Sequence, residues 1–128
     1  MALTGDPVPL TFAGVREIAL ALPGVEEGTS YGTPSLRVRK RFLARLHEDG
    51  ESLVLKVDPA VRGSLVDADP VTFSVTDHLE SHPYVLVRLS TAGREEVRSL
   101  FEAAWRREAP QALVRACDAG QIRDRRLP

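Results

Sequence analysis

The sequence contains a single cysteine, Cys117, so it can form neither an internal disulfide framework nor a zinc site that needs several thiolates. No stretch approaches the roughly 18 continuous apolar residues of a membrane-spanning helix. The first ten residues, MALTGDPVPL, have neither the basic start nor the apolar run of a signal peptide. These absences predict a cytoplasmic protein that does not contact a membrane.

An excess of charge of either sign is also missing, because the formal net charge is only −1. The hydrophobic fraction of 43% and the charged fraction of 27% are close to those of ordinary globular proteins, which argues against disorder. A length of 128 residues predicts one domain, residues 1–128, with a single core. A dedicated nucleic-acid binder is usually basic overall, so such a role would have to rest on a local patch. The sequence has no catalytic signature, and we expect no enzyme activity and no cofactor.

Hydrophobic periodicity predicts a helix, three strands, a short helix, two strands and a long helix, in that order. Val15, Ile18, Ala19 and Leu22 recur at helical spacing and predict the first helix, with Thr11 as its N-cap and Pro23-Gly24 at its end. The polar stretch 26–33 is expected to be a loop. Alternating residues predict strands at 34–39, 42–47 and 53–57, with the chain turning at Lys40-Arg41 and at Asp49-Gly50.

The second half of the chain begins with a short helix that follows Asp58-Pro59 and runs to Val66. Strands are expected at 71–76 and 84–89, joined by the irregular segment DHLESHP, and the long helix ends at Pro110. A shorter amphipathic segment follows around Leu113, and residues 121–128 are expected to fray. This order predicts an α+β two-layer sandwich, with an antiparallel sheet of about five strands and helices on one face.

The outward positions of the predicted strands are mostly basic, and no acidic residue falls inside those strands. The cationic residues expected to share the face away from the helices are Arg37, Arg39, Arg45, Lys56 and Arg88. Such a face would attract phosphates, and Tyr84 beside it would stack on a base. The alternative is that long charged side chains only keep an uncovered sheet face soluble and protect its edges.

Two other segments carry candidate groups. The loop GTSYGTPS, centred on Tyr31, would form either an anion-binding concavity with a stacking platform or a plain structural turn. Asp77, His78 and His82 would act as metal ligands or a general base only if their side chains converge, and otherwise belong to a solvated loop. Because Pro83 disfavours the helix that this histidine spacing needs, we predict no metal site and no catalytic residue.

The stretches LPGVEEGTSYGTPSLRVRKRFLARLHEDGESLVLKVDP, FSVTDH, YVLVRL and EEVRSLFEAAWRREAP resemble the MmcQ/YjbR family of small bacterial proteins. The resemblance extends from about Leu20 to Pro110. It implies a double-wing fold similar to the frataxin/CyaY sandwich and suggests DNA binding, and it assigns no catalytic residue. Frataxins gather acidic residues on their first helix for iron, whereas the corresponding helix here carries only Glu17, so no iron role is expected.

The leading hypothesis is a non-enzymatic nucleic-acid-binding module. Its phosphate contacts would be Arg37, Arg39, Arg45, Lys56 and Arg88, and its stacking residue would be Tyr84. The alternative is a protein-interaction or self-associating domain, in which the same face meets an acidic partner or a second copy of the chain. A third class, an enzyme that works through Asp77, His78 and His82, requires those side chains to meet in a pocket.

Overall fold

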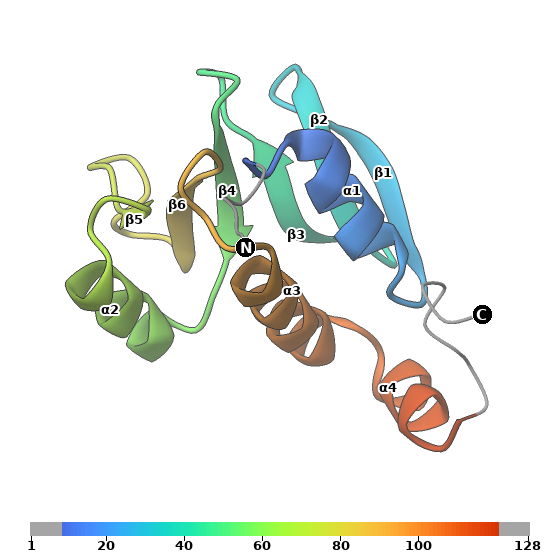
Figure 1. Ribbon diagram of the computed structural model, residues 1–128. Helices are drawn as coiled ribbons and strands as arrows, with labels where there is room; N and C mark the ends of the chain where they lie inside the picture. Colours follow the sequence, from blue (N-terminus) through green and yellow to red (C-terminus); the bar gives the residue numbers. More distant parts are fainter. Residues whose placement is uncertain (1–8, 121–128) are drawn as a thin grey trace, which may run out of the picture.

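The computed structural model describes residues 9–120, in which helices cover one face of a six-stranded antiparallel sheet (Figure 1). The strands are β1 (Val25–Ser30), β2 (Thr33–Val38), β3 (Arg41–Leu46), β4 (Ser52–Lys56), β5 (Phe73–Ser74) and β6 (Tyr84–Arg88), in the sheet order β1-β2-β3-β4-β6-β5. The helices are α1 (Phe12–Leu20), α2 (Pro59–Ala68), α3 (Arg94–Glu108) and α4 (Gln111–Asp118). The predicted α+β class with an antiparallel sheet is confirmed, while the prediction for residues 121–128 lies outside the described part.

Two helices begin at the residues that the sequence predicts. The Thr11 hydroxyl accepts the N–H of Gly14 at the start of α1, and the Asp58 carboxylate accepts the N–H of Ala60 at the start of α2. Among residues 9–120, no helix combines the length and the apolar character needed to cross a membrane.

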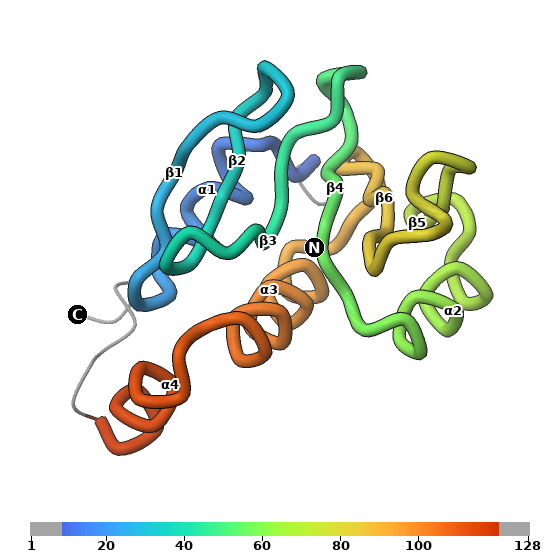
Figure 2. Tube along the Cα trace, turned by 180° about the vertical axis from the view of Figure 1, so that it is seen from behind, coloured from blue at the N-terminus to red at the C-terminus, as the bar shows by residue number. Residues whose placement is uncertain are grey.

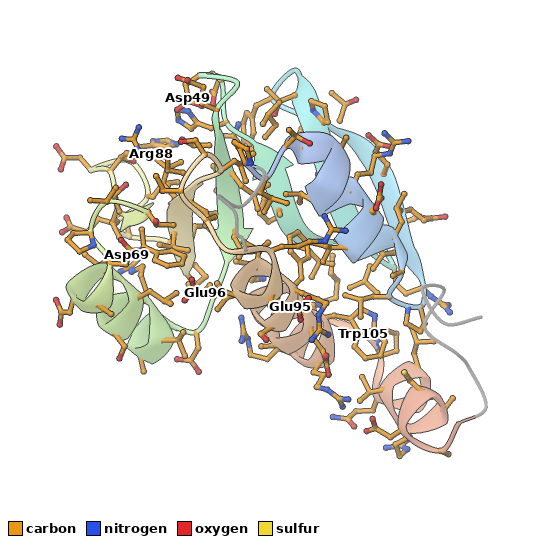
Figure 3. The ribbon with its side chains drawn as sticks, in the orientation of Figure 1. Asp49, Asp69, Arg88, Glu95, Glu96 and Trp105 are labelled. Carbon is orange, nitrogen blue, oxygen red and sulfur yellow. The ribbon has the colours of Figure 1, made fainter. Side chains whose placement is uncertain are left out.

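The core lies between the sheet and helices α1 and α3, and Trp105 of α3 is one of its largest fully buried side chains. Its ring is 1% exposed, and its indole N–H donates to the carbonyl of Pro23 at 2.8 Å (Figure 3). Gly24 follows at φ +77°, where a Cβ atom would come within 2.9 Å of Leu113 Cδ2. A residue without a side chain is therefore needed where α4 packs against the turn between α1 and β1.

Strand β1 corrects the expectation of a loop at 26–33. Only Val25 and Ser30 of this strand are buried, because β1 is an edge strand, and its polar residues and Gly28 give no apolar alternation. Its pairing with β2 nevertheless runs from Val25 opposite Val38 to Ser30 opposite Thr33. The sheet consequently has six strands, and Glu26 lies directly opposite Arg37, so the basic strands do have an acidic neighbour.

The turn between β2 and β3 also differs from its prediction. Arg39 and Lys40 occupy it with φ values of +49° and +73°, which two-residue hairpin turns of type I′ require, and Arg41 already belongs to β3. The prediction that Arg39 shares the face of Arg37 is therefore wrong. Its side chain lines a shallow depression formed with Pro110 and α4.

A bulge in β3 reverses the predicted sides of two residues. Leu36 pairs with Ala44 but Arg37 pairs with Phe42, which leaves Leu43 as an extra residue. Strict alternation over 42–47 predicts Leu43 on the same side as Arg45 and Phe42 on the core side, whereas Leu43 is buried in the core and Phe42 points to the opposite face beside Arg37. Arg45, by contrast, keeps its predicted side, opposite Val54 of β4.

We predict that Trp105→Phe lowers the free energy of unfolding by about 2–3 kcal/mol, because the Pro23 carbonyl loses its donor and the smaller ring leaves a void. Urea denaturation measures the change. Val71→Ala, at a residue that is 64% exposed, is the control and should stay within about 0.5 kcal/mol of the wild type. Equal stability of Trp105→Phe and the wild type would contradict this role for the indole.

Candidate functional site: a cavity on the outer sheet face

The sheet face turned away from α1 and α3, which we call the outer face, is partly covered by residues 75–83, which we call the covering loop; Figure 2 views the sheet from this side. Val54 lies on the outer face of the central strand β4, yet it is only 1% exposed. Leu79 of the covering loop is 4% exposed and lines the same cavity as Val54, and neither residue belongs to the main core. The covering loop therefore buries apolar surface of its own.

Arg62 of α2 fixes the covering loop. Its Nη1 donates to the carbonyl oxygens of Leu79, His82 and Tyr84 at 3.4, 2.6 and 3.2 Å, and its Nη2 donates to that of Glu80 at 3.2 Å. Because DHLESHP forms turns, many of its carbonyls find no partner in a regular ladder. One guanidinium binds three of them, together with the Tyr84 carbonyl at the start of β6, and ties the loop to the helix.

The covering loop and the outer face enclose a cavity of about 240 Å³, which we call the outer cavity. Its floor comes from four strands and its two walls come from the β1–β2 hairpin and from the covering loop. The lining residues are Ser30 and Tyr31 of the hairpin, Arg37, Phe42, Arg45, Val54 and Tyr84 of the floor, and His78, Leu79 and His82 of the loop. Among the described residues, no aspartate or glutamate lines this cavity.

A chain of ring contacts runs through the outer cavity. The rings of His78 and His82 lie 6.3 Å apart, His82 stacks on Tyr84 at 5.6 Å, and Tyr84 meets Phe42 at 5.3 Å between ring centroids. The Arg37 guanidinium closes the series, 5.9 Å from the centre of the Phe42 ring. Four segments thus contribute planar groups to one continuous surface, which ends in a cation.

Arg45 forms the second cationic part of the outer cavity and is only 7% exposed. Its Nη1 donates to Glu48 Oε1 at 2.9 Å and to the Leu46 carbonyl at 3.3 Å, and its guanidinium lies 5.1 Å from the Tyr31 ring centre. The hydrogen bond from Arg45 holds the pKa of the Glu48 carboxyl below its usual value. Tyr31 itself is held at φ +53°, a conformation uncommon for residues other than glycine.

The structure brings together three of the six residues that the sequence nominated: Arg37, Arg45 and Tyr84 line the outer cavity. Arg39 does not, for the reason given above. Lys56 does not line the cavity either: it lies 3.2 Å from Glu108 of α3, which also binds Arg41 at 3.0 Å, so its ammonium group is held in an ion pair at the end of the sheet. Arg88 is exposed and donates to the Val71 carbonyl at 3.2 Å, away from the cavity (Figure 3).

Sequence reasoning missed part of this site. The bulge that turns Phe42 outward leaves no trace in the alternation of residues, and nothing in the sequence links Arg62 to the covering loop. His78 and His82 do converge on the outer cavity, whereas Asp77 does not line it. Within residues 9–120 there is no group of three or more histidine, cysteine or acidic side chains arranged to hold a metal ion.

A model of the YjbR family matches residues 20–107, which is more than half of the chain. The chain belongs to the YjbR family. All residues that line the outer cavity of this YjbR domain fall within the matched range. The family resemblance inferred from the sequence is thus confirmed, and the cavity is built from the region on which family membership rests.

Relatives of this YjbR domain include Rv2570 of Mycobacterium tuberculosis and Mb2600 of Mycobacterium bovis, both described as uncharacterized proteins. Each is 34% identical over 59 residues, which cover 46% of this chain and 46% of the relative, so the match spans less than half of their length. The crystal structure of DR2400 from Deinococcus radiodurans, a protein with a DUF419 domain, has a TM-score of 0.68 at 24% identity. That match covers 83% of this chain and 86% of the other, and it establishes a common fold.

We predict that Arg62→Ala loosens the covering loop of the YjbR domain and lowers the free energy of unfolding by about 1–3 kcal/mol, because carbonyls lose a charged donor. Hydrogen exchange should be faster at the amides of Leu79 and His82, which bond within the loop. Arg94→Ala, which removes an exposed ion pair with Glu17, is the matched control and should cost less than about 1 kcal/mol. Unchanged exchange at the loop amides would refute the role of Arg62.

The Arg45–Glu48 pair predicts a pH dependence. Because the pKa of Glu48 is lowered in the folded protein, its contribution to stability is present above its ordinary pKa, which is near 4.5, and is lost as the pH falls through the lower folded value. Glu48→Gln should therefore be less stable than the wild type at pH 7, and the difference should shrink at pH 3. Urea midpoints at the two pH values measure it. Glu80→Gln, at an exposed carboxylate of the covering loop, serves as the control. If the stability difference between Glu48→Gln and the wild type grew on acidification, the pKa of Glu48 would be raised and not lowered by folding.

Proposed function

We propose that this YjbR domain is a non-enzymatic module that binds single-stranded nucleic acid at the outer cavity. The chain of rings from His78 to Arg37 is the observation that carries the proposal. Proteins that bind single strands combine aromatic rings, on which bases stack, with cations that contact the backbone. Each stacked base contributes about 1–3 kcal/mol to binding.

The charge inside the cavity supports the same ligand class. Arg37 and Arg45 are its two cations, and both belong to its floor. A guanidinium grips a phosphate through two parallel N–H groups, and it does so more strongly in a partly buried site. No carboxylate among the described residues lines the cavity, and the one that pairs with Arg45, Glu48, binds only its Nη1 from outside the cavity.

The shape favours single strands over duplexes. The base edges and faces of a duplex are stacked inside it, whereas a single strand exposes them to aromatic side chains. The two walls of the outer cavity also stand above its floor, so a rigid double helix would meet the hairpin and the covering loop first. Furthermore, Lys56 and Arg39 are withdrawn from the outer face, which shortens the cationic track that a duplex would follow.

A protein-interaction or self-associating role is the second candidate, and β1 favours it. Among the strands that the structure describes, β1 lies at the edge of the sheet with four exposed residues, and it leads into the turn at Tyr31, which is 85% exposed. An unpaired strand edge beside an exposed aromatic ring is a common template for pairing with another chain.

We predict that the domain binds a labelled single-stranded oligonucleotide more tightly than a duplex of the same sequence. If Arg37 and Arg45 each neutralise one phosphate, the slope of log K against log salt concentration should be about −1.4. Fluorescence anisotropy at several salt concentrations measures both quantities. Tyr84→Ala should reduce affinity by about 1–3 kcal/mol through lost stacking.

Arg88→Ala is the matched control, because it removes a cation of the same sheet face that does not line the cavity, and it should leave binding unchanged. Equal affinity for both nucleic acids, or equal losses in Arg37→Ala and Arg88→Ala, would refute the site. A concentration-dependent dimer in light scattering, together with no oligonucleotide binding, would favour the second candidate.

A further inference from the structure

We infer that the outer cavity is a pocket for one nucleotide, so that the domain recognises a strand end or an extruded nucleotide and also binds free nucleoside monophosphates. The inference rests on the proposed function and names the ligand of that site. It assigns the phosphate to the two arginines of the floor, and the base to the rings of the two walls.

The arginines have N–H groups to spare for a phosphate. Within residues 9–120, the hydrogen bonds of Arg45 to protein groups all come from Nη1, and that of Arg37 comes from its Nη2, which donates to Ser30 Oγ. Both guanidinium groups are thus fixed in place by one nitrogen while the other N–H groups remain for a ligand. An anion placed there would complete their hydrogen bonds in a partly desolvated environment, where charged pairs are strongest.

The rings on the two walls suit a base. Tyr31 overhangs from the hairpin with most of its ring in solvent, and His82 presents its ring from the covering loop, stacked on Tyr84 with an interplanar angle of 20°. Both side chains line the cavity, so a planar group that enters it meets a ring from either side. Tyr31 and Gly32, at φ +53° and +78°, form the two-residue turn between β1 and β2, as Arg39 and Lys40 do in the next hairpin, and this turn fixes where the Tyr31 side chain leaves the hairpin.

The size limits the occupant. A cavity of about 240 Å³ is smaller than the roughly 300–1,000 Å³ of pockets for drug-sized ligands. It therefore has room for no more than one nucleotide unit, and not for a stacked run of bases. The rest of a longer nucleic-acid strand would have to lie outside the cavity, as it can when the bound nucleotide is terminal or turned out of its base stack.

The covering loop supplies one of the two walls, and Arg62 holds that loop in place. Arg62 does not line the cavity, so its contribution to binding is to position His82 and Leu79. A loosened wall should weaken the contact with the base and leave the phosphate site on the floor intact. Arg62 is thus a positioning residue whose effect depends on whether the ligand has a base.

The experiment is titration calorimetry of the full chain with uridine and adenosine 5′-monophosphates, the two nucleosides and inorganic phosphate. We expect each monophosphate to bind at least tenfold more tightly than its nucleoside or phosphate alone. Arg37→Ala should reduce monophosphate affinity at least tenfold, while Arg88→Ala should not change it. Arg62→Lys should weaken the monophosphates severalfold and leave phosphate binding unchanged.

The outcomes separate this inference from the proposed function. Oligonucleotide binding without monophosphate binding overturns the inference and leaves the proposed function standing. Equal affinities for phosphate and for the monophosphates would show that the cavity binds anions without contacting the base, and would also overturn the inference. Loss of both oligonucleotide and monophosphate binding overturns both proposals. Equal weakening of phosphate and monophosphates by Arg62→Lys removes the positioning role.

Discussion

The hydrogen bonds from Arg62 to three carbonyl oxygens of the covering loop and to that of Tyr84, at the start of β6, are the contact on which the outer face of the sheet depends. The carbonyls of Leu79 and His82 also accept backbone N–H groups, so what Arg62 adds is the connection between the loop and α2. Ordering each residue of the loop costs about 1–2 kcal/mol of conformational entropy. The charged donor and the burial of Leu79 offset part of that cost. The anchored loop thereby turns the outer face, which would otherwise be exposed to solvent, into a cavity with two walls.

Strands with one side in the core could be predicted from the sequence, whereas strands with little buried surface could not. Val85 and Val87 are buried while Tyr84, Leu86 and Arg88 between and beside them are more exposed, because one side of β6 faces the core, and β-branched strands of this kind can be predicted from their pattern. Strand β1 has little buried surface, so Glu26, Glu27 and Gly28 read as a loop although the backbone pairs fully with β2. In β3 one extra residue, Leu43, shifts the alternation, and a bulge of this kind has no local signature.

The candidate site was predictable only in part, for a related reason. Arg37, Arg45 and Tyr84 were found from strand alternation alone. Lys56 was nominated by the same rule, but it forms an ion pair with Glu108, which lies 52 positions later in the chain, and Arg41 binds the same carboxylate across 67 positions of sequence. Such pairings depend on how α3 crosses the sheet, which no local pattern contains. An extended cationic face therefore reduces to two arginines in a hollow.

This reduction changes the chemistry that the outer face can perform. A broad cationic surface binds any polyanion, with an affinity set by the number of phosphates and the salt concentration. Under the proposed function, two arginines at the end of a chain of rings would instead distinguish an anion that carries a base from inorganic phosphate, because the rings contribute only when a base is present. Since the residues that line the outer cavity all fall within the range matched by the YjbR family model, the same comparison can be made in other members of the family. Where a relative lacks the counterpart of Arg62, its covering loop should lose its anchor, and the outer face should behave as the simple charged surface that the sequence first suggested.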